Sequence, residues 1–168
     1  MFSKELIEIK GEPFIIEMMY AAKANMMQTA VYEQIGFGNR AFVCRELWKK
    51  LQKLIPILQK RRQKLKICDA FRPPLAHQMM LEIIPMPGFF AVSSERSLHC
   101  HAAAIDCCLC DATGAELRYP TKVDAYTPEY ARQVCQGGVT AFQKHLLSRE
   151  IRCLINSLGY ENISNKQE

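Results

Sequence analysis

The sequence predicts an α+β fold, with one mainly antiparallel sheet packed against helices. Three observations predict it. Short apolar stretches of strand character stand apart from one another, a long amphipathic helical pattern lies between two of them, and Pro- or Gly-rich segments separate the elements. Hydrophobic residues make up 49% of the 168 residues, so the chain can bury a sizeable core. We therefore expect one domain over residues 1–168.

The first half contains the strongest helical signal. Residues 13–20 have strand character, and residues 21–38, with Gly36 and Gly38, are expected to be irregular and partly packed. From 41 to about 63, apolar residues recur at spacings close to one face of a helix: Phe42, Leu47, Leu51, Leu54, Ile57 and Leu58. Pro56 lies inside this pattern, and we expect it to kink or divide the helix.

The second half alternates short strands and helices. Residues 65–70 form a short apolar strand that ends before Pro73 and Pro74. A buried strand is expected at about 103–110, followed by a turn at 111–114 and a partner strand at 116–119. The remaining expectations are a helix at 75–84, a loop at 85–88, and helices at 128–134 and 140–158, the last closed by Gly159.

The excess of basic residues is concentrated in one segment. The net charge is +5, and eight Lys or Arg with no acidic residue lie between Lys49 and Lys66. We interpret the segment as the solvated side of an amphipathic helix. The alternative is a phosphate-binding face of a nucleic-acid module, which would bind with a steep salt dependence. Trp48 is the one aromatic residue beside these charges, which disfavours single-strand binding, and we expect no nucleic-acid partner.

The eight cysteines are expected to be reduced core residues, because several lie in apolar runs and the chain needs no disulfide staples. The cluster Cys107, Cys108 and Cys110 lacks the paired Cys-x-x-Cys spacing of a structural zinc site. No segment has the length of a membrane span or the pattern of a signal peptide. We therefore expect a cytoplasmic protein without a membrane partner.

His99 and Asp106 are the first candidate metal ligands. They stand seven positions apart, and residues an odd number apart on a continuous strand point to opposite faces. They can share an ion only if the chain bends, so the metal hypothesis predicts a loop at 99–102 that leads into a strand from about 103. The alternative is a core histidine with satisfied hydrogen bonds beside a strand-end aspartate.

Ser97, His99, Ala104 and Asp106 form the first of four short motifs that stand in register along the chain. Together these motifs resemble the D-alanyl-D-alanine dipeptidase family of zinc peptidases. The family motif Ser-x-His-x-x-Gly-x-Ala-x-Asp is matched by Ser97, His99, Ala104 and Asp106. The other matches are an Asp-x-x-Arg-Pro stretch at 69–73, a Tyr-Ala pair at 20–21 followed by Asn25, and the Thr and Asp of a later motif at Thr121 and Asp124.

The resemblance implies a zinc dipeptidase that hydrolyses D-Ala-D-Ala, with one Zn²⁺ per chain and a small dipeptide as its partner. It implies His99 and Asp106 as two of three zinc ligands and Arg72 as the group that stabilises the oxyanion. An ion pair of Arg72 with Asp69 on the surface is the alternative for that residue. The resemblance also implies that Asp124 meets the α-ammonium of the substrate, with Ser97 and Tyr20 lining the same pocket.

Two departures from the family pattern bear on activity. The family has a Glu-x-x-His near its C-terminus that supplies the general base and the third ligand, whereas this sequence stops at Glu168. Glu168 is either that catalytic carboxylate or a solvated chain end, and His101 is a candidate substitute ligand. Ala102 stands where the family has Gly, which costs about 1 kcal/mol or more if the position needs a positive φ. A catalytically inactive relative that binds a D-Ala-D-Ala-type peptide or wall fragment is therefore the alternative function.

Overall fold

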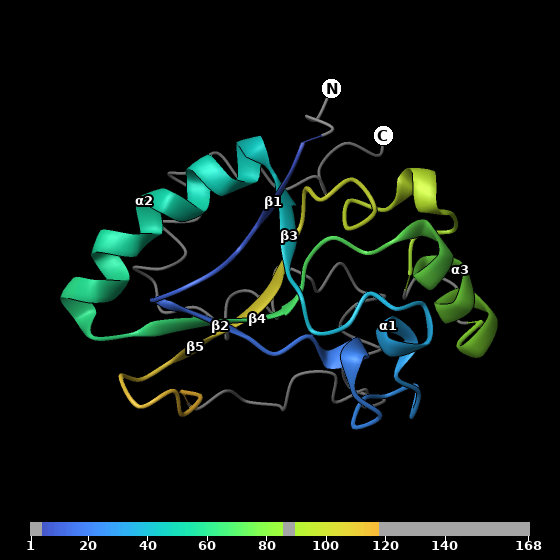
Figure 1. Ribbon diagram of the computed structural model, residues 1–168, viewed down its shortest axis with the longest axis horizontal. Coiled ribbons are helices and arrows are strands. Elements are labelled where there is room, and N and C mark those ends of the chain that lie inside the picture. The colour runs from blue at the N-terminus through green and yellow to red at the C-terminus, as the bar shows by residue number, and fades with distance from the viewer. Residues whose placement is uncertain (1–4, 86–89, 118–168) are drawn as a thin grey trace, which may run out of the picture. The chain divides into compact units, whose positions relative to one another are not determined.

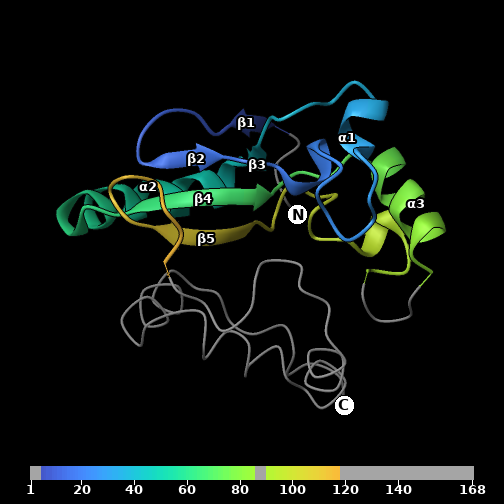
Figure 2. The same ribbon diagram turned by 90° about the horizontal axis from the view of Figure 1, so that it is seen from below.

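A computed structural model of the chain describes residues 5–85 and 90–117. Its strands form two small sheets (Figures 1 and 2). In the first, β1 (Leu6–Glu8) pairs antiparallel with β3 (Phe42–Cys44). In the second, β4 (Lys64–Asp69) lies between β2 (Phe14–Ile16) and β5 (Asp106–Cys110). Strands and helices follow one another along the chain, and the predicted α+β class is confirmed.

The three-stranded sheet is mixed. Strand β2 runs parallel to β4, and β5 runs antiparallel to it. The central strand β4 is the most buried of the three, with Ile67 fully enclosed and Leu65 6% exposed. This burial explains why residues 65–70 form a strand: a central strand with apolar neighbours on both sides favours an apolar run.

Helix α2 (Arg45–Arg61) begins later than the periodicity predicts, because residues 42–44 pair with β1 instead of joining the helix. Pro56 does not divide the helix, which is continuous to Arg61. Leu47, Leu51 and Leu58 are its buried residues, and Phe14 of β2 packs against Trp48 with ring centroids 6.0 Å apart. The helix lies along the sheets (Figure 1). Its buried leucines show that the apolar stripe faces inward.

The basic residues of this segment face solvent or acidic partners. Lys49, Lys53 and Lys60 are exposed on α2. Lys66 of β4 forms ion pairs with Glu17 and Glu116, at 2.7 and 3.0 Å. The arrangement is that of a solvated amphipathic helix followed by a strand with local ion pairs.

Helices α1 (Val31–Gln34) and α3 (Pro74–Ile83) gather beyond the end of β4, with the short 3₁₀ turn η1 (Met19–Ala21) beside α1 (Figure 2). The sequence gives no periodic signal for α1, which has only four residues. It is held by packing, since Val31 and Tyr32 are fully buried and the Tyr32 ring meets Phe37 edge-on at 5.2 Å. The predicted helix at 75–84 is confirmed as α3.

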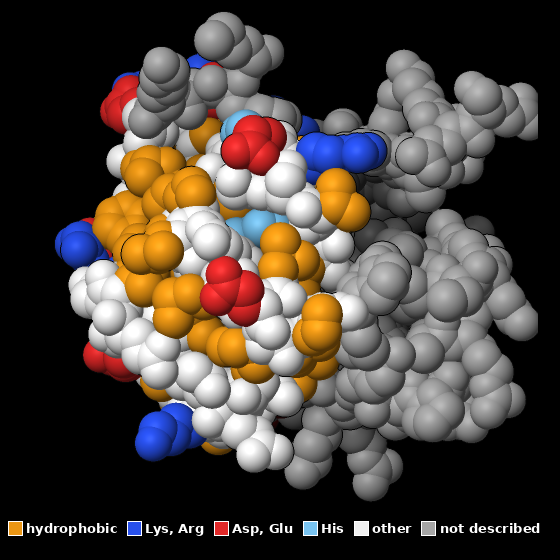
Figure 3. All heavy atoms as spheres, turned by 90° about the vertical axis from the view of Figure 1, so that its right-hand side faces the viewer, with side chains coloured by type: hydrophobic (Ala, Val, Ile, Leu, Met, Phe, Trp, Pro, Cys, Tyr) orange, Lys and Arg blue, Asp and Glu red, His pale blue; other side chains and the backbone are white. Residues whose placement is uncertain are grey.

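Figure 3 shows hydrophobic side chains gathered on the face of the molecule that carries these helices. Among residues 5–85 and 90–117, the exposed large hydrophobic side chains are Leu6, Leu75, Ile83 and Val92.

The chain after β5 turns as predicted. Oδ1 of Asp111 accepts hydrogen bonds from the backbone N–H groups of Thr113 and Ala115, at 2.8 and 3.1 Å, and Gly114 has a φ of +94°. The expected partner strand at 116–119 is reduced to one bridge between Cys110 and Glu116 within the described residues. The expected helices at 128–134 and 140–158 lie outside the described residues.

The cysteines of the described ranges are all free thiols. Cys44, Cys68, Cys108 and Cys110 are buried, as expected for core residues, whereas Cys107 is exposed. Among residues 5–85 and 90–117, no helix combines the length and apolar character needed to cross a bilayer.

Candidate metal centre

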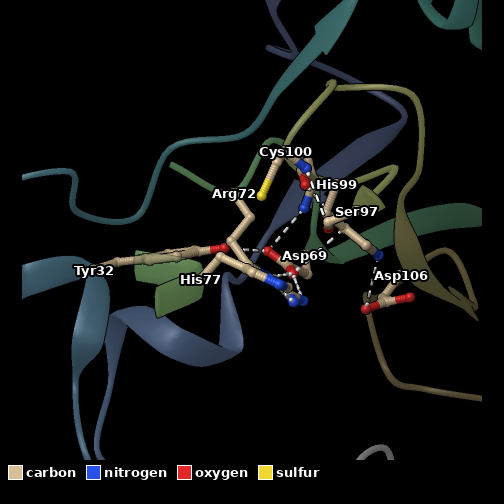
Figure 4. Close-up of polar contacts among 9 residues, drawn as sticks. Tyr32, Asp69, Arg72, His77, Ser97, His99, Cys100 and Asp106 are labelled. Carbon is tan, nitrogen blue, oxygen red and sulfur yellow. Dashed lines mark hydrogen bonds and ion pairs between the residues drawn. The ribbon is translucent and has the colours of Figure 1, made fainter. Parts of the chain in front are cut away.

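The candidate site lies at one end of the three-stranded sheet. Asp69 is the last residue of β4, Asp106 is the first residue of β5, and the antiparallel register places them opposite each other. The register shifts between Ile67 and Asp69, which is the irregularity expected of a bulge. Two carboxylates far apart in sequence therefore lie side by side because two strands meet at this end (Figure 4).

A tight turn brings His99 to the same place. The backbone N–H groups of Ala102 and Arg72 both donate to the His99 carbonyl, at 2.9 and 3.1 Å. The carbonyl of Ala102 in turn accepts from the N–H of Cys44, at 2.8 Å, which fixes the turn to the end of β3. The predicted bend at 99–102 is confirmed, although the strand that follows begins at 106.

Ala102 adopts a left-handed backbone conformation, which is unfavourable for a residue other than glycine. Its φ is +55°, in the left-handed region, and its side chain is 1% exposed. A non-glycine residue held there costs about 1–2 kcal/mol. The turn that carries His99 is therefore maintained against local strain by the bonds to Arg72 and Cys44.

The two ring nitrogens of His99 have different roles. Nδ1 lies 2.9 Å from the carbonyl oxygen of Ala70, and because a carbonyl can only accept, Nδ1 carries the proton. The lone pair is then on Nε2, which lies 3.7 Å from Oδ2 of Asp106. Two ligands of a tetrahedral zinc ion are about 3.4 Å apart, since each stands about 2.0–2.2 Å from the metal.

This geometry fits a divalent cation between His99 and Asp106. A backbone carbonyl that orients the ring of a histidine ligand is a usual outer-shell contact in metal sites. The His99 and Asp106 side chains are 18% and 49% exposed, so the point between them can be reached from solvent. Asp69 also has a carboxylate oxygen within 4.8 Å of the ligand atoms of the other two.

Asp69 and Arg72 form a buried ion pair rather than the surface pair considered from the sequence. Nη2 and Nε of Arg72 donate to Oδ2 of Asp69, at 2.5 and 3.2 Å, and the two side chains are 5% and 0% exposed. Burial by itself would lower the pKa of Arg72, but the adjacent charge of Asp69 more than offsets it and the pKa stands above its ordinary value. Arg72 is thus a permanent cation close to the candidate metal ligands.

The side chains of Tyr32 and His77 also contact the Asp69 and Arg72 pair. Tyr32 donates its hydroxyl to Oδ1 of Asp69, at 2.5 Å. Burial, followed by the charge of Asp69, raises the pKa of Tyr32 far above its ordinary value. His77 of α3 donates from Nε2 to the carbonyl of Ala91, at 2.9 Å, and its Nδ1 lies 3.5 Å from Nη1 of Arg72. Burial lowers the pKa of His77 and so favours its neutral form.

Tyr20 lies beside Arg72, and Ser97 lies beside the turn that carries His99. Cζ of Arg72 stands over the Tyr20 ring, 5.4 Å from its centroid. Ser97 is 4% exposed, and its hydroxyl oxygen lies 3.4 Å from the backbone nitrogen of Cys100, which donates to it. The structure therefore places both residues next to the Arg72 and His99 cluster, and their contact with a substrate stays a prediction.

The remaining candidate site residues are His101, Asp124 and Glu168. His101 is exposed and donates from Nε2 to the carbonyl of Glu95, at 2.8 Å, so this ring nitrogen is engaged away from the His99 and Asp106 pair. Asp124 and Glu168 lie outside the described residues.

Sequence reasoning gave Tyr32 no role, and it considered a surface ion pair of Asp69 with Arg72 only as an alternative. The spacing of Asp69 and Arg72 across a strand end signals the pair, but its burial depends on α1, α3 and the Tyr20 and Phe90 rings around it. Tyr32 carries no motif signal, because its contact with Asp69 spans 37 positions.

The comparisons with known proteins give one partial match. The chain is 32% identical over 99 residues to D-alanyl-D-alanine dipeptidase of Escherichia coli (strain K12). The match covers 59% of this chain and 49% of that protein, so the chain spans about half the length of the curated relative. No protein-family model matches the chain. The similarity supports a relationship between this chain and that dipeptidase.

Proposed function

We propose that the chain is a metal-dependent peptidase, and specifically a zinc dipeptidase that hydrolyses D-Ala-D-Ala to free D-alanine. The observation that carries the proposal is the pairing of an oriented His99 Nε2 with Asp106 beside a buried, permanently charged Arg72. The similarity to a D-alanyl-D-alanine dipeptidase supports the substrate class. One Zn²⁺ per chain is the proposed cofactor.

The proposed chemistry divides between the ion and the protein. A zinc ion held by His99 and Asp106 would lower the pKa of a bound water to about 7 and polarise the scissile carbonyl. Arg72 would stabilise the negative charge that develops on that carbonyl oxygen. Its bonds to Asp69 and His77 use three of its five N–H groups, so two are not needed for these contacts. A fixed donor of this kind contributes a few kcal/mol to lowering the barrier.

The remaining roles concern the two ends of the substrate and the proton. Asp124 would bind the α-ammonium group, which restricts the substrate to a free dipeptide, and Tyr20 and Ser97 would line the pocket for the small side chains. Glu168 would serve as the general base. The assignments of Tyr20, Ser97 and Asp124 follow the motif match, whereas Glu168 is assigned because it stands where the Glu-x-x-His motif would begin. None of the four carries a distance to a substrate.

The test is zinc binding and D-alanine release by the purified chain after removal of metal and addition of Zn²⁺. We expect about one Zn²⁺ per chain and hydrolysis of D-Ala-D-Ala, with no hydrolysis of N-acetyl-D-Ala-D-Ala because the α-ammonium is blocked. His99→Ala and Asp106→Asn should lose both zinc and activity. His101→Ala, a histidine in the same turn, is the matched control and should keep both.

A folded protein that releases no D-alanine with zinc present would overturn the proposed activity. Retained binding of D-Ala-D-Ala without turnover would instead support an inactive, peptide-binding relative. Zinc binding that survives His99→Ala would remove the proposed metal site itself.

A further inference from the structure

We propose that Tyr32 and Asp69 are positioning residues that fix the Arg72 guanidinium beside the His99 and Asp106 pair, and that Asp69 is not a metal ligand. The inference deepens the proposed function, on which its catalytic consequence rests. The evidence is a continuous buried chain of contacts, from the Tyr32 hydroxyl through both oxygens of Asp69 to Arg72 (Figure 4).

The carboxylate of Asp69 is already engaged on both oxygens. Oδ1 accepts from the Tyr32 hydroxyl and from the backbone N–H of Ala70, at 2.5 and 3.0 Å. Oδ2 accepts two N–H groups of Arg72. A cation bound directly to Asp69 would have to displace one of these donors and would leave a buried polar or charged group without its partner, which is costly. His99 and Asp106 carry no such penalty, since Nε2 and Oδ2 face each other across an accessible gap.

Arg72 is held on its other sides as well. Neutral His77 presents Nδ1 to Nη1, because its Nε2 proton is committed to the carbonyl of Ala91. The guanidinium carbon lies 5.4 Å from the Tyr20 ring centroid and 5.2 Å from that of Phe90. These contacts give the guanidinium one orientation, and an oriented donor is what oxyanion stabilisation requires, because a freely rotating one must first be ordered.

A substitution of Tyr32 can distinguish two roles of the buried cluster, which are to orient the Arg72 guanidinium or only to neutralise its charge. Tyr32→Phe keeps the ring that packs edge-on against Tyr20 and Phe37 and keeps the Asp69 and Arg72 ion pair. It removes the hydroxyl bond to Oδ1 and leaves the backbone N–H of Ala70 as the donor to that oxygen. The Asp69 carboxylate is then held less tightly, and so is the guanidinium bound to it. Removing an oxyanion donor altogether costs about 100- to 1,000-fold in kcat. Tyr32→Phe loosens the donor and does not remove it, so we expect a smaller loss of about tenfold.

The experiment compares wild type and Tyr32→Phe by three measurements. The first is the ¹H–¹⁵N spectrum of the Arg72 side chain, assigned by the signals that Arg72→Lys removes. We expect resolved Nη signals in the wild type, because rotation of the guanidinium is slow, and merged or shifted signals in Tyr32→Phe. The second is zinc affinity, which should be unchanged in Tyr32→Phe. The third is dipeptide hydrolysis, in which kcat should fall about tenfold while KM is unchanged.

Asp69→Asn tests the claim about the ligand, with Asp111→Asn as its matched control in an exposed turn. We expect zinc affinity to fall far less in folded Asp69→Asn than in Asp106→Asn. Zinc loss in Asp69→Asn equal to that in Asp106→Asn, with Arg72 signals intact, would make Asp69 a ligand and overturn the inference. Unchanged Arg72 signals in Tyr32→Phe would overturn it equally. If the wild type releases no D-alanine, the proposed function fails, while the spectra and zinc affinities still decide whether Tyr32 and Asp69 position Arg72.

Discussion

The buried ion pair of Asp69 and Arg72 makes a strong prediction about stability. The two side chains are 0% and 5% exposed, so water cannot replace a lost partner. Asp69→Asn keeps the size of the side chain but leaves the Arg72 charge buried without its counterion. Breaking a buried pair in this way costs about 3–5 kcal/mol of unfolding free energy. This is a large share of the total for a small domain, which is typically about 5–15 kcal/mol.

The assay is urea unfolding of wild type, Asp69→Asn, Arg72→Met and the double variant. The double variant should lose less than the sum of the two single losses, with a coupling of about 2 kcal/mol or more, because it removes both charges together. Glu8→Gln is the control, since the Glu8 pair with Arg40 is on the surface and its loss should be much smaller. A loss below about 1 kcal/mol in Asp69→Asn would refute the reasoning, because it is the value of a solvated pair.

Three further predictions concern the turn and two titrating groups. Ala102→Val should lower stability by about 2 kcal/mol or more and weaken zinc binding, because a branched side chain is added at a buried residue with positive φ; urea unfolding and zinc titration measure both effects. The lowered pKa of His77 means that the unfolded chain binds the proton more readily, so stability should fall as the pH drops below about 6.5, and less steeply in His77→Gln. Arg40 and Lys10 lower the pKa of Glu8 from 4.5 to about 2, so its contribution is present above about pH 4.5; the stability difference between wild type and Glu8→Gln should therefore shrink as pH falls towards 2.

The sequence predicts those elements whose signal is local. Strand β4 and helix α3 are found within a residue or so, because an apolar run and the Pro-Pro boundary mark their limits. The bend at 99–102 follows from the hypothesis that His99 and Asp106 share a metal ion, because a continuous strand would point them to opposite faces. Helix α2 is found with the wrong start, because pairing of residues 42–44 with β1 is a long-range contact that periodicity does not report.

The candidate site can likewise be predicted only where its residues stand in local sequence motifs. His99, Asp106 and Arg72 stand in motifs, whereas Tyr32 and His77 enter through packing of α1 and α3 around Arg72. The parallel pairing of β2 with β4 is likewise set by tertiary contacts, since the sequence between these strands contains both β3 and α2.

The pairing of β4 with β5 has a consequence for how the site tolerates change. Asp106 faces His99 only in the observed alignment of the two strands, in which Leu65 lies opposite Leu109 and Asp69 opposite Asp106. A slip of one residue would turn Cys107 towards the histidine and Asp106 to the other side. Packing of hydrophobic side chains in the middle of the sheet thus sets the strand register that brings Asp106 to His99. Substitutions at Leu65 or Leu109 can therefore weaken metal binding without touching a ligand.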